Sequence, residues 1–441
     1  MANPFKDIMK IKRDEFPLAI LMFGYFFLVI TSFWILKPLK KSLFLTFYDK
    51  IGFDFYQWHM TASQAELLAK VLNMFVAFIA VVVFTVLVKK FKRQQLTLIF
   101  SSFFMVCYVV FSLSINNPGA LTVWSFYLFG DLFSTLMVAT FFAFLNDSVS
   151  PDSAKRLYGL IGLGGVTGGV FGTMVLRTMI ERLSTSSWLW VCFAVAVLII
   201  FLALKAGKIV SKNPPGIESK KVETQEPKSS ENPAFEGAKL VFKSPYLLSI
   251  VGIVGLYEIV STIVDFQFSS TILHYLDGSA IGTQFATAFM IMNIVSLFVQ
   301  LFLTSFIMTR FGLTVALLFL PIAITLGSTM FMAIPILWIG SLLVTADNGF
   351  AYSINQSSKE TLYVPTRRDE KYKAKAFIDM FVQRFAKAIA VGVSLVITMN
   401  FTDFSSIRWL SLVSIVITVI WIIAVRYAGK KFQQMTSNHS L

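Results

Sequence analysis

The most informative charged residues of this sequence lie between Lys359 and Lys387, in the run KETLYVPTRRDEKYKAKAFIDMFVQRFAK. Twelve of its 29 residues are charged, although the chain around them is strongly apolar. Lys371, Lys373 and Lys375 alternate near an expected helix start, where their ammonium groups and the positive end of the helix dipole together attract an anion. Lysine suits phosphate as a compact point charge. This pattern predicts a site that attracts a polyanion.

The same run carries charge deeper than a surface loop requires. Asp379, Arg384 and Lys387 fall inside an apolar helix that we expect to extend to about Met399. A cytoplasmic loop accounts for Arg367 and its neighbours, but ionised groups at membrane depth are costly and point to function. We therefore assign Asp379 and Arg384 to charge balance or coupling.

Two other apolar segments contain ionisable pairs. Glu66 and Lys70 stand at i and i+4, so they face the same way and either neutralise one another or line a cavity. Glu258 and Asp265 are seven residues apart, which is close to two helical turns and places both acids on one face. They bind a cation or proton, pair with substrate-binding lysines, or form a structural salt bridge to Arg384 or Lys387; the sequence leaves these alternatives open.

A basic group follows the first apolar segment: Lys37, Lys40, Lys41 and Lys50. One interpretation is a collar of lysines whose stems snorkel at the membrane edge. The other is a basic patch at the mouth or wall of a translocation cavity.

These residues must be positioned by membrane helices. The chain has 441 residues, 56% of them hydrophobic and 15% aromatic, with a mean hydropathy of +0.72. Apolar runs long enough to cross a bilayer recur along its whole length. We predict an all-α polytopic membrane protein with twelve spans, at about 17–36, 66–88, 96–115, 121–145, 158–180, 187–206, 246–271, 282–309, 312–333, 334–357, 376–399 and 406–427.

The spans divide six and six around a polar segment, 207–245, that is rich in Lys, Glu, Pro and Ser and that we expect to be a flexible cytoplasmic linker. The predicted domains are thus an N-terminal six-helix half, 1–206, and a C-terminal half, 246–441. This is the major-facilitator layout, in which substrate binds near the midplane between the halves. Most Lys and Arg residues fall in alternate loops, which predicts cytoplasmic N- and C-termini.

Several classes of function are disfavoured. Cys107 and Cys192 lie in apolar spans and the three histidines are scattered, so we expect neither a disulfide framework nor a metal site. The fifth span, GLIGLGGVTGGVFG, lacks the Gly-Lys-Ser/Thr of a phosphate loop, and we expect its glycines to serve close helix packing. The net charge of +14 follows membrane topology, so we expect no nucleic-acid partner.

The run that ends at Lys387 resembles the nucleotide transporter (ATP/ADP antiporter) family of plastids and obligate intracellular bacteria. The resemblance rests on Lys359-Glu360, on Tyr363-Val364-Pro365, and on K-x-K-x-K-A-x-I-D from Lys371 to Asp379. The match is long and ordered, and it is rich in residues that membranes disfavour. It implies a major-facilitator-like carrier of nucleotides, with Lys371, Lys373 and Lys375 as phosphate ligands.

Weaker similarities to this family extend over most of the chain. They imply Lys40, within FWILKPLKKSLFLT, as a further phosphate ligand beside Lys37. AELLAK matches the family's Glu and Lys of the second span, as Glu66 and Lys70. In FFAFLNDSVS the resemblance implies that Asn146 contacts base or sugar. The acids at Asp147 and Asp265 would balance the lysines or couple transport to protons.

One position departs from the family. Nucleotide exchangers typically carry a lysine four residues after the acid of the seventh span, and Ser269 stands there in this chain. Each charge-assisted contact contributes about 1.5–3 kcal/mol, so losing one lowers the affinity for a polyanion. This departure leaves open which solute is carried.

Together these features predict a transporter rather than an enzyme, without cofactor or metal, in a bacterial inner membrane. Its expected partners are a nucleotide such as ATP or ADP and the lipid bilayer, and we expect a monomer. Two alternatives remain: a proton-coupled carrier of another anionic or small solute, indicated by Glu258, Asp265 and Ser269, and a receptor that binds partners through segment 207–245.

Overall fold

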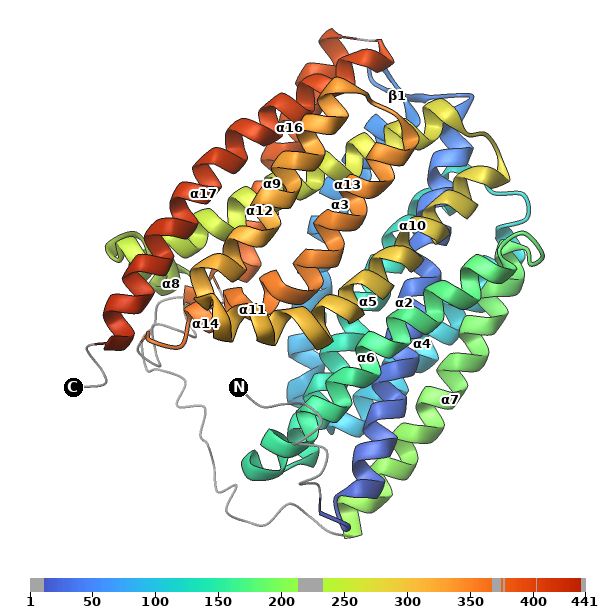
Figure 1. Cartoon of the computed structure of the whole chain (residues 1–441). Coiled ribbons are helices and arrows are strands. Elements are labelled where there is room, and N and C mark those ends of the chain that lie inside the picture. The colour runs from blue at the N-terminus through green and yellow to red at the C-terminus, as the bar shows by residue number, and fades with distance from the viewer. Residues whose placement is uncertain (1–11, 213–232, 367–373, 376, 402, 438–441) are drawn as a thin grey trace. The chain divides into compact units, whose positions relative to one another are not determined.

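Long apolar helices make up nearly all of the structure, a computed structural model that describes residues 12–212, 233–366, 374–375, 377–401 and 403–437 (Figure 1). Ten helical stretches in these ranges are long and apolar enough to cross a membrane. They begin within a few residues of ten of the twelve predicted spans. The predicted class of an all-α polytopic membrane protein is therefore confirmed, whereas the number twelve stays a prediction.

The other two predicted spans, 334–357 and 376–399, are helical but interrupted. A π-helical turn, η2 (Ala351–Asn355), separates α13 (Leu337–Phe350) from α14 (Gln356–Leu362). Another, η3 (Ile378–Val382), precedes α16 (Gln383–Asn400). Such turns insert one extra residue into a helix and are frequent at functional sites.

The chain divides into two compact units. The first comprises Met1–Ala62, Leu72–Glu226 and Gly278–Asn293, and the second comprises Ser63–Val71, Pro227–Asp277 and Ile294–Leu441. The units differ from the predicted halves because short stretches of two helices, 63–71 and 278–293, cluster with the opposite unit. The halves and the linker therefore remain a prediction.

The first unit is built around one helix that is longer than predicted. This helix, α2, runs over Phe16–Asp49, and it packs against α5, α6 and α7. The other elements of the unit are β1 (Phe53–Phe55), β2 (Trp58–Met60), most of α3 (Ala62–Lys90), α4 (Arg93–Ser114), α5 (Ala120–Ser148), α6 (Pro151–Met179), α7 (Thr185–Lys212) and the first part of α10 (Ser279–Phe298). The expectation that the first basic group lies after the first span is wrong: Lys37, Lys40 and Lys41 are inside the helix, and Lys50 caps its end.

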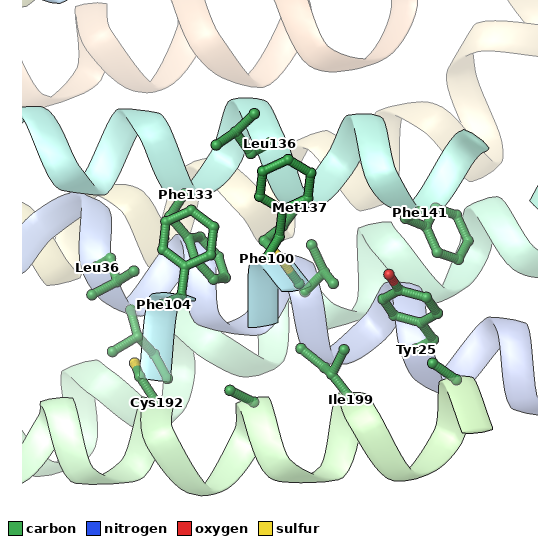
Figure 2. Packing of buried hydrophobic residues seen from close by; sticks show 14 of the residues in the cluster. Tyr25, Leu36, Phe100, Phe104, Phe133, Leu136, Met137, Phe141, Cys192 and Ile199 are labelled. Atoms are coloured by element: carbon green, nitrogen blue, oxygen red, sulfur yellow. The ribbon is translucent and has the colours of Figure 1, made fainter. Parts of the chain in front are cut away.

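The core of the first unit is aromatic. Tyr25 meets Phe141 edge-on at a ring-centroid distance of 5.0 Å, and Phe104 meets Phe133 in the same way at 5.0 Å. Figure 2 shows these rings lying among Leu36, Met137 and Ile199. Edge-to-face pairs add to the packing of helices in lipid, where hydrophobic burial alone does not drive association.

The second unit is organised around α9 (Pro245–Tyr275), which packs against α8, α13, α16 and α17. Its remaining helices are α8 (Pro233–Lys243), η1 (Val299–Leu303), α11 (Thr304–Arg310), α12 (Gly312–Ala333), η4 (Phe404–Ile407) and α17 (Arg408–Ser437), besides those already given. Because α7 continues to Lys212 and α8 covers 233–243, both ends of the predicted flexible linker are helical; its residues 213–232 lie outside the described ranges.

The glycines of α6 serve close helix packing, as the sequence predicts, and the helix that they contact is α2. A Cβ atom built on Gly164 would lie 2.7 Å from the carbonyl oxygen of Phe23, and one on Gly172 would lie 2.7 Å from that of Thr31. One turn between them, Gly168 faces the carbonyl of Phe27 in the same way. The spacing of four residues recurs on both helices, so a whole stripe of α6 is in backbone contact with α2.

We expect Gly168→Ala to lower the free energy of unfolding by about 1–3 kcal/mol, because its methyl group would press on the backbone of α2. The matched control on the same helix is Gly162→Ala, whose Cβ meets nothing within 4 Å. This control should be neutral or slightly stabilising, since alanine favours helix. Thermal unfolding of the purified proteins measures both, and equal stability of the two variants would contradict the assigned packing.

Candidate functional site

A face of α2 in the first unit carries three lysines within five residues. Lys37, Lys40 and Lys41 stand at i, i+3 and i+4, so their side chains project from neighbouring positions on the helix. Lys40 and Lys41 are only 5% and 4% exposed, which excludes a snorkelling collar for these two residues. Pro38 lies among them and, having no N–H, interrupts the helical hydrogen-bond ladder at this point.

Lys40 is held by an acid that the sequence prediction overlooked. Its ammonium group forms an ion pair with Asp131 of α5, and the Asn73 side-chain amide donates a hydrogen bond of 2.8 Å to the same carboxylate oxygen. The Lys40 nitrogen also lies 4.4 Å from the centre of the Tyr127 ring. Gly130 makes room for the lysine stem, since a Cβ there would lie 2.6 Å from Lys40 Cδ. The Lys40 ammonium group is thus buried with its charge compensated, whereas Asp131 is 28% exposed.

Aromatic rings surround the other two lysines of this face. The Lys37 nitrogen lies 4.6 Å from the Trp34 ring centre and 5.1 Å from that of Phe289 on α10. The Lys41 nitrogen lies 5.1 Å from the centre of Phe285. Ring faces attract cations, so these contacts stabilise ammonium groups away from water.

In the second unit the seventh predicted span, α9, meets the start of α3. Lys70 Nζ lies 2.5 Å from Asp265 Oδ2 and 3.9 Å from Glu66 Oε1. The predicted site residues Glu66, Lys70 and Asp265 therefore form one cluster. Ser269 lies one turn beyond the acid, and its hydroxyl donates to the Asp265 carbonyl oxygen at 2.8 Å. A hydroxyl bound to its own helix supplies no positive charge to this cluster.

The second acid of α9 pairs with a different lysine. Glu258 Oε2 lies 3.5 Å from Lys387 Nζ of α16, so one of the partners considered for it, Lys387, is the one observed. Between the two acids, the Ser261 hydroxyl donates a hydrogen bond of 2.7 Å to Asp347 of α13. Asp347 is fully buried and is a second acid that the sequence prediction overlooked.

The segment with the highest charge density is described only in part. Lys371 and Lys373 lie outside the described residues. Lys375 Nζ lies 2.5 Å from Glu360 Oε2, and 5.9 Å from the ring centre of Tyr363. Asp379 accepts a hydrogen bond of 3.4 Å from Gln383, and Arg384 is partly buried on α16.

Asn146 and Asp147 occupy the last turn of α5, where both are exposed. The Tyr158 hydroxyl donates to the Asn146 side-chain oxygen, and Asp147 lies 3.2 Å from Arg93. Among the contacts described, they join this end of α5 to α6 and α4 rather than to Lys40.

A further ion pair lies at the start of α2, between Glu15 and Arg156. The Arg156 hydrogen bond lowers the pKa of Glu15 from 4.5 to about 2. The pair therefore stabilises the fold above the ordinary pKa of the acid, and this contribution is lost as pH falls through about 2.

The signal for the overlooked acids was present in the sequence. Asp131 lies within predicted span 121–145 and Asp347 within 334–357, and an ionisable residue inside a span is a functional candidate by default. Asn73 and Tyr127 carry no comparable signal, because neither an amide nor a phenol is unusual in a membrane helix.

Chemically, these clusters are suited to binding rather than to bond breaking. Lysines in low-dielectric surroundings bind carboxylates strongly, and an incoming anion with more charge competes for the same ammonium groups. Within the described ranges, no group of three His, Cys, Asp or Glu residues is placed to hold a metal ion.

Comparison with known families agrees with this chemistry. The Major Facilitator Superfamily model matches residues 18–368, and the TLC ATP/ADP transporter model matches residues 334–432. The chain is 22% identical over 354 residues to the chloroplastic ADP,ATP carrier protein 1 of Arabidopsis thaliana, covering 73% of this chain and 56% of that protein. The chain thus spans little more than half the length of this plant relative. It is 23% identical to the ADP,ATP carrier protein 1 of Rickettsia bellii, covering 98% and 97%. The predicted resemblance to nucleotide transporters is confirmed.

Solved structures show the same fold. The nucleoside transporter NupG superposes with a TM-score of 0.65 at 13% identity, covering 93% of this chain and 99% of NupG. A bacterial homolog of the human lysosomal transporter Spinster superposes with a TM-score of 0.59 at 13% identity, covering 96% and 98%.

We expect loss of the Asp131 charge alone to destabilise the protein more than loss of both charges of the Lys40–Asp131 pair. Asp131→Asn should lower the free energy of unfolding by about 3–5 kcal/mol, because it leaves a buried ammonium group without its carboxylate. Adding Lys40→Met to that variant should restore much of the loss.

The control is Glu181→Gln, which removes the acid of the exposed pair with Arg177 and should change stability by no more than about 1 kcal/mol. Chemical unfolding in detergent measures all variants. If Asp131→Asn changed the free energy of unfolding as little as Glu181→Gln does, the expected cost of leaving the buried Lys40 ammonium group unpaired would be contradicted.

Proposed function

Because this chain belongs to the Major Facilitator Superfamily, we propose that it is an alternating-access carrier of nucleotides or closely related phosphorylated anions. The match of residues 334–432 to the TLC ATP/ADP transporter model supports this substrate class. The similarity to ADP,ATP carriers of plastids and intracellular bacteria supports it as well. Exchange of ADP for ATP needs no covalent chemistry, so the carrier needs neither catalytic residues nor a cofactor.

The observation that carries the proposal is the ion pair that the buried Lys40 forms with Asp131 in the first unit. An apolar solute would not require an ammonium group at this place, and a buried ammonium group is costly to maintain. A phosphate group bearing two or more negative charges would replace the Asp131 carboxylate at Lys40. Lys37 and Lys41, whose ammonium groups lie close to aromatic rings, would add to this attraction.

Two lysines of the second unit have the same arrangement. Lys375 with Glu360, and Lys70 with Asp265, each combine an ammonium group with a carboxylate at 2.5 Å. In this proposal the acids hold the lysines in place and neutralise them until an anion competes. Lys371 and Lys373 would add to the phosphate site at Lys375.

Asn146 is proposed to contact the base or sugar, since its side chain is exposed and its amide can recognise polar edges. Asp147, Asp379 and Arg384 would balance the charges of the substrate-binding lysines or take part in coupling. The carrier would work as a monomer in a bacterial inner membrane, with both termini in the cytoplasm.

One observation favours a second candidate, a proton-coupled carrier of another anionic or small solute. Ser269 contributes a hydroxyl where nucleotide exchangers typically have a lysine, while Glu258 and Asp265 occupy the same helix. A site with less positive charge suits a smaller anion that is accompanied by a proton.

We expect proteoliposomes loaded with ADP to take up labelled ATP, and to take up much less when the internal ADP is omitted. Lys40→Met should reduce this uptake by tenfold or more, since one charge-assisted contact of about 1.5–3 kcal/mol is lost. The matched control is Lys50→Met, which removes an exposed lysine at the end of the same helix and should leave uptake unchanged.

The same vesicle assay can also contradict the proposal. Vesicles that take up an uncharged solute through the protein, but none of a panel of nucleotides, would contradict nucleotide transport. Uptake that ignores internal nucleotide and collapses with a protonophore would favour the second candidate.

A further inference from the structure

A short hairpin of β1 and β2 lies between α2 and α3, and its two faces differ in chemistry. Residues paired across two strands lie on the same face, and the faces alternate along each strand. The pairs of this hairpin are Phe53 with Met60, Asp54 with His59, and Phe55 with Trp58. The first and third pairs are apolar and share one face. The other face carries Asp54 and His59, which form an exposed ion pair at 2.7 Å.

The inner end of the apolar face is packed against a membrane span. Met60 is buried, and the Phe53 ring lies 5.2 Å from that of Trp124 in the second turn of α5. The Trp124 indole N–H donates a hydrogen bond of 2.8 Å to the hydroxyl of Tyr48 on α2. The 29 residues of α5 extend over about 43 Å, close to the thickness of a bilayer with its headgroups. Its first turns, and the hairpin beside them, therefore lie in the interfacial layer.

The outer end of the apolar face is exposed. Phe55 and Trp58 are 50% and 59% exposed, and Tyr56 in the turn between them is 93% exposed. A lone two-stranded hairpin is only marginally stable in water, and apolar side chains gathered on a surface mark an interaction site. These three rings therefore form a surface suited to an apolar environment.

The backbone of the turn also indicates a use for the tyrosine ring. Tyr56 has a φ of 57°, in the left-handed region that glycine adopts easily and a bulky residue adopts at a cost in free energy. Strained positions of this kind persist where the residue has a role. Because the Tyr56 side chain is exposed, packing within the first unit does not account for it. Its ring is available to a partner.

We propose that the hairpin inserts Phe55, Tyr56 and Trp58 into the interfacial layer of the phospholipid bilayer, while Asp54 and His59 face water. Tryptophan and tyrosine are enriched at this depth, because their rings are apolar and their N–H and O–H groups reach the headgroups. Lipid is the partner that the position selects, since the hairpin continues from α2 and packs on the first turns of α5. The inference goes beyond the proposed function and holds for any transported solute.

The first experiment compares neighbouring residues on opposite faces of β1. In a background of Cys107→Ala and Cys192→Ala, a nitroxide label is attached to Phe55→Cys or to the matched control Asp54→Cys. In phosphatidylcholine vesicles, oxygen, which concentrates in lipid, should relax the label at position 55 several-fold more effectively than a water-soluble nickel chelate does. The label at position 54 should show the reverse order. Equal access of the chelate to both labels would overturn the proposal.

The second experiment keeps the wild-type hairpin. The emission lost in Trp58→Phe reports on Trp58, and that lost in Trp188→Phe reports on a buried indole near the start of α7. In vesicles of phosphatidylcholine with brominated acyl chains, Trp58 should be quenched several-fold more than Trp188. Iodide in the water should quench Trp58 only weakly.

Two results of this quenching measurement would contradict insertion into lipid. Quenching of Trp58 by iodide but not by brominated lipid would place the hairpin tip in water. Protection of Trp58 from both quenchers would show that protein covers the tip, either a second copy of this chain or another partner.

Discussion

The cost of ionised side chains in a membrane is the constraint on which the rest of this structure depends. An ammonium or carboxylate group in the hydrocarbon layer must be compensated, or it loses its charge. Lys40 is compensated by Asp131, Lys70 by Asp265, Lys375 by Glu360, and Lys387 by Glu258. These pairs recur on different helices of both units. At the buried Lys40, an apolar residue would serve a protein that needed only to fold at least as well.

Helix packing provides the geometry that these pairs require. In the first unit, the glycine stripe of α6 holds α2 by backbone contact, and Gly130 of α5 leaves space for the stem of Lys40. Small residues thus set the distances at which the long side chains meet. In the second unit, α9 presents Asp265 to α3 and Glu258 to α16, and its Ser261 hydroxyl contacts an acid of α13. The π-helical turns after Asp347 and before Gln383 interrupt the regular α-helical hydrogen bonding near this face of α9.

Most of the architecture could be predicted from the sequence because apolar run length is a strong local signal. The span predicted at 312–333 coincides with α12, and the one at 246–271 lies within α9. The end of α2 was misplaced for a physical reason. Lys37, Pro38 and Lys40 resemble the end of a span, and the burial of Lys40 depends on Asp131, 91 residues away in the sequence. A sequence pattern of a few neighbouring residues cannot reveal a partner that lies so far away in the chain. For the same reason, the resemblance could point to Lys40 as a candidate site residue, but not to Asp131, which pairs with it.

The central claim is that an anion with several charges competes with Asp131 for Lys40. It is tested most directly by the melting temperature of the purified protein across a panel of nucleotides. At about 100 times the dissociation constant, ATP or ADP should stabilise the wild-type protein by about 2.7 kcal/mol. Because Lys40→Met loses a contact of about 1.5–3 kcal/mol, the same concentration should stabilise that variant by only about 0.3–1.3 kcal/mol. Melting temperatures that do not respond to any nucleotide, or that rise equally in both proteins, would contradict the account.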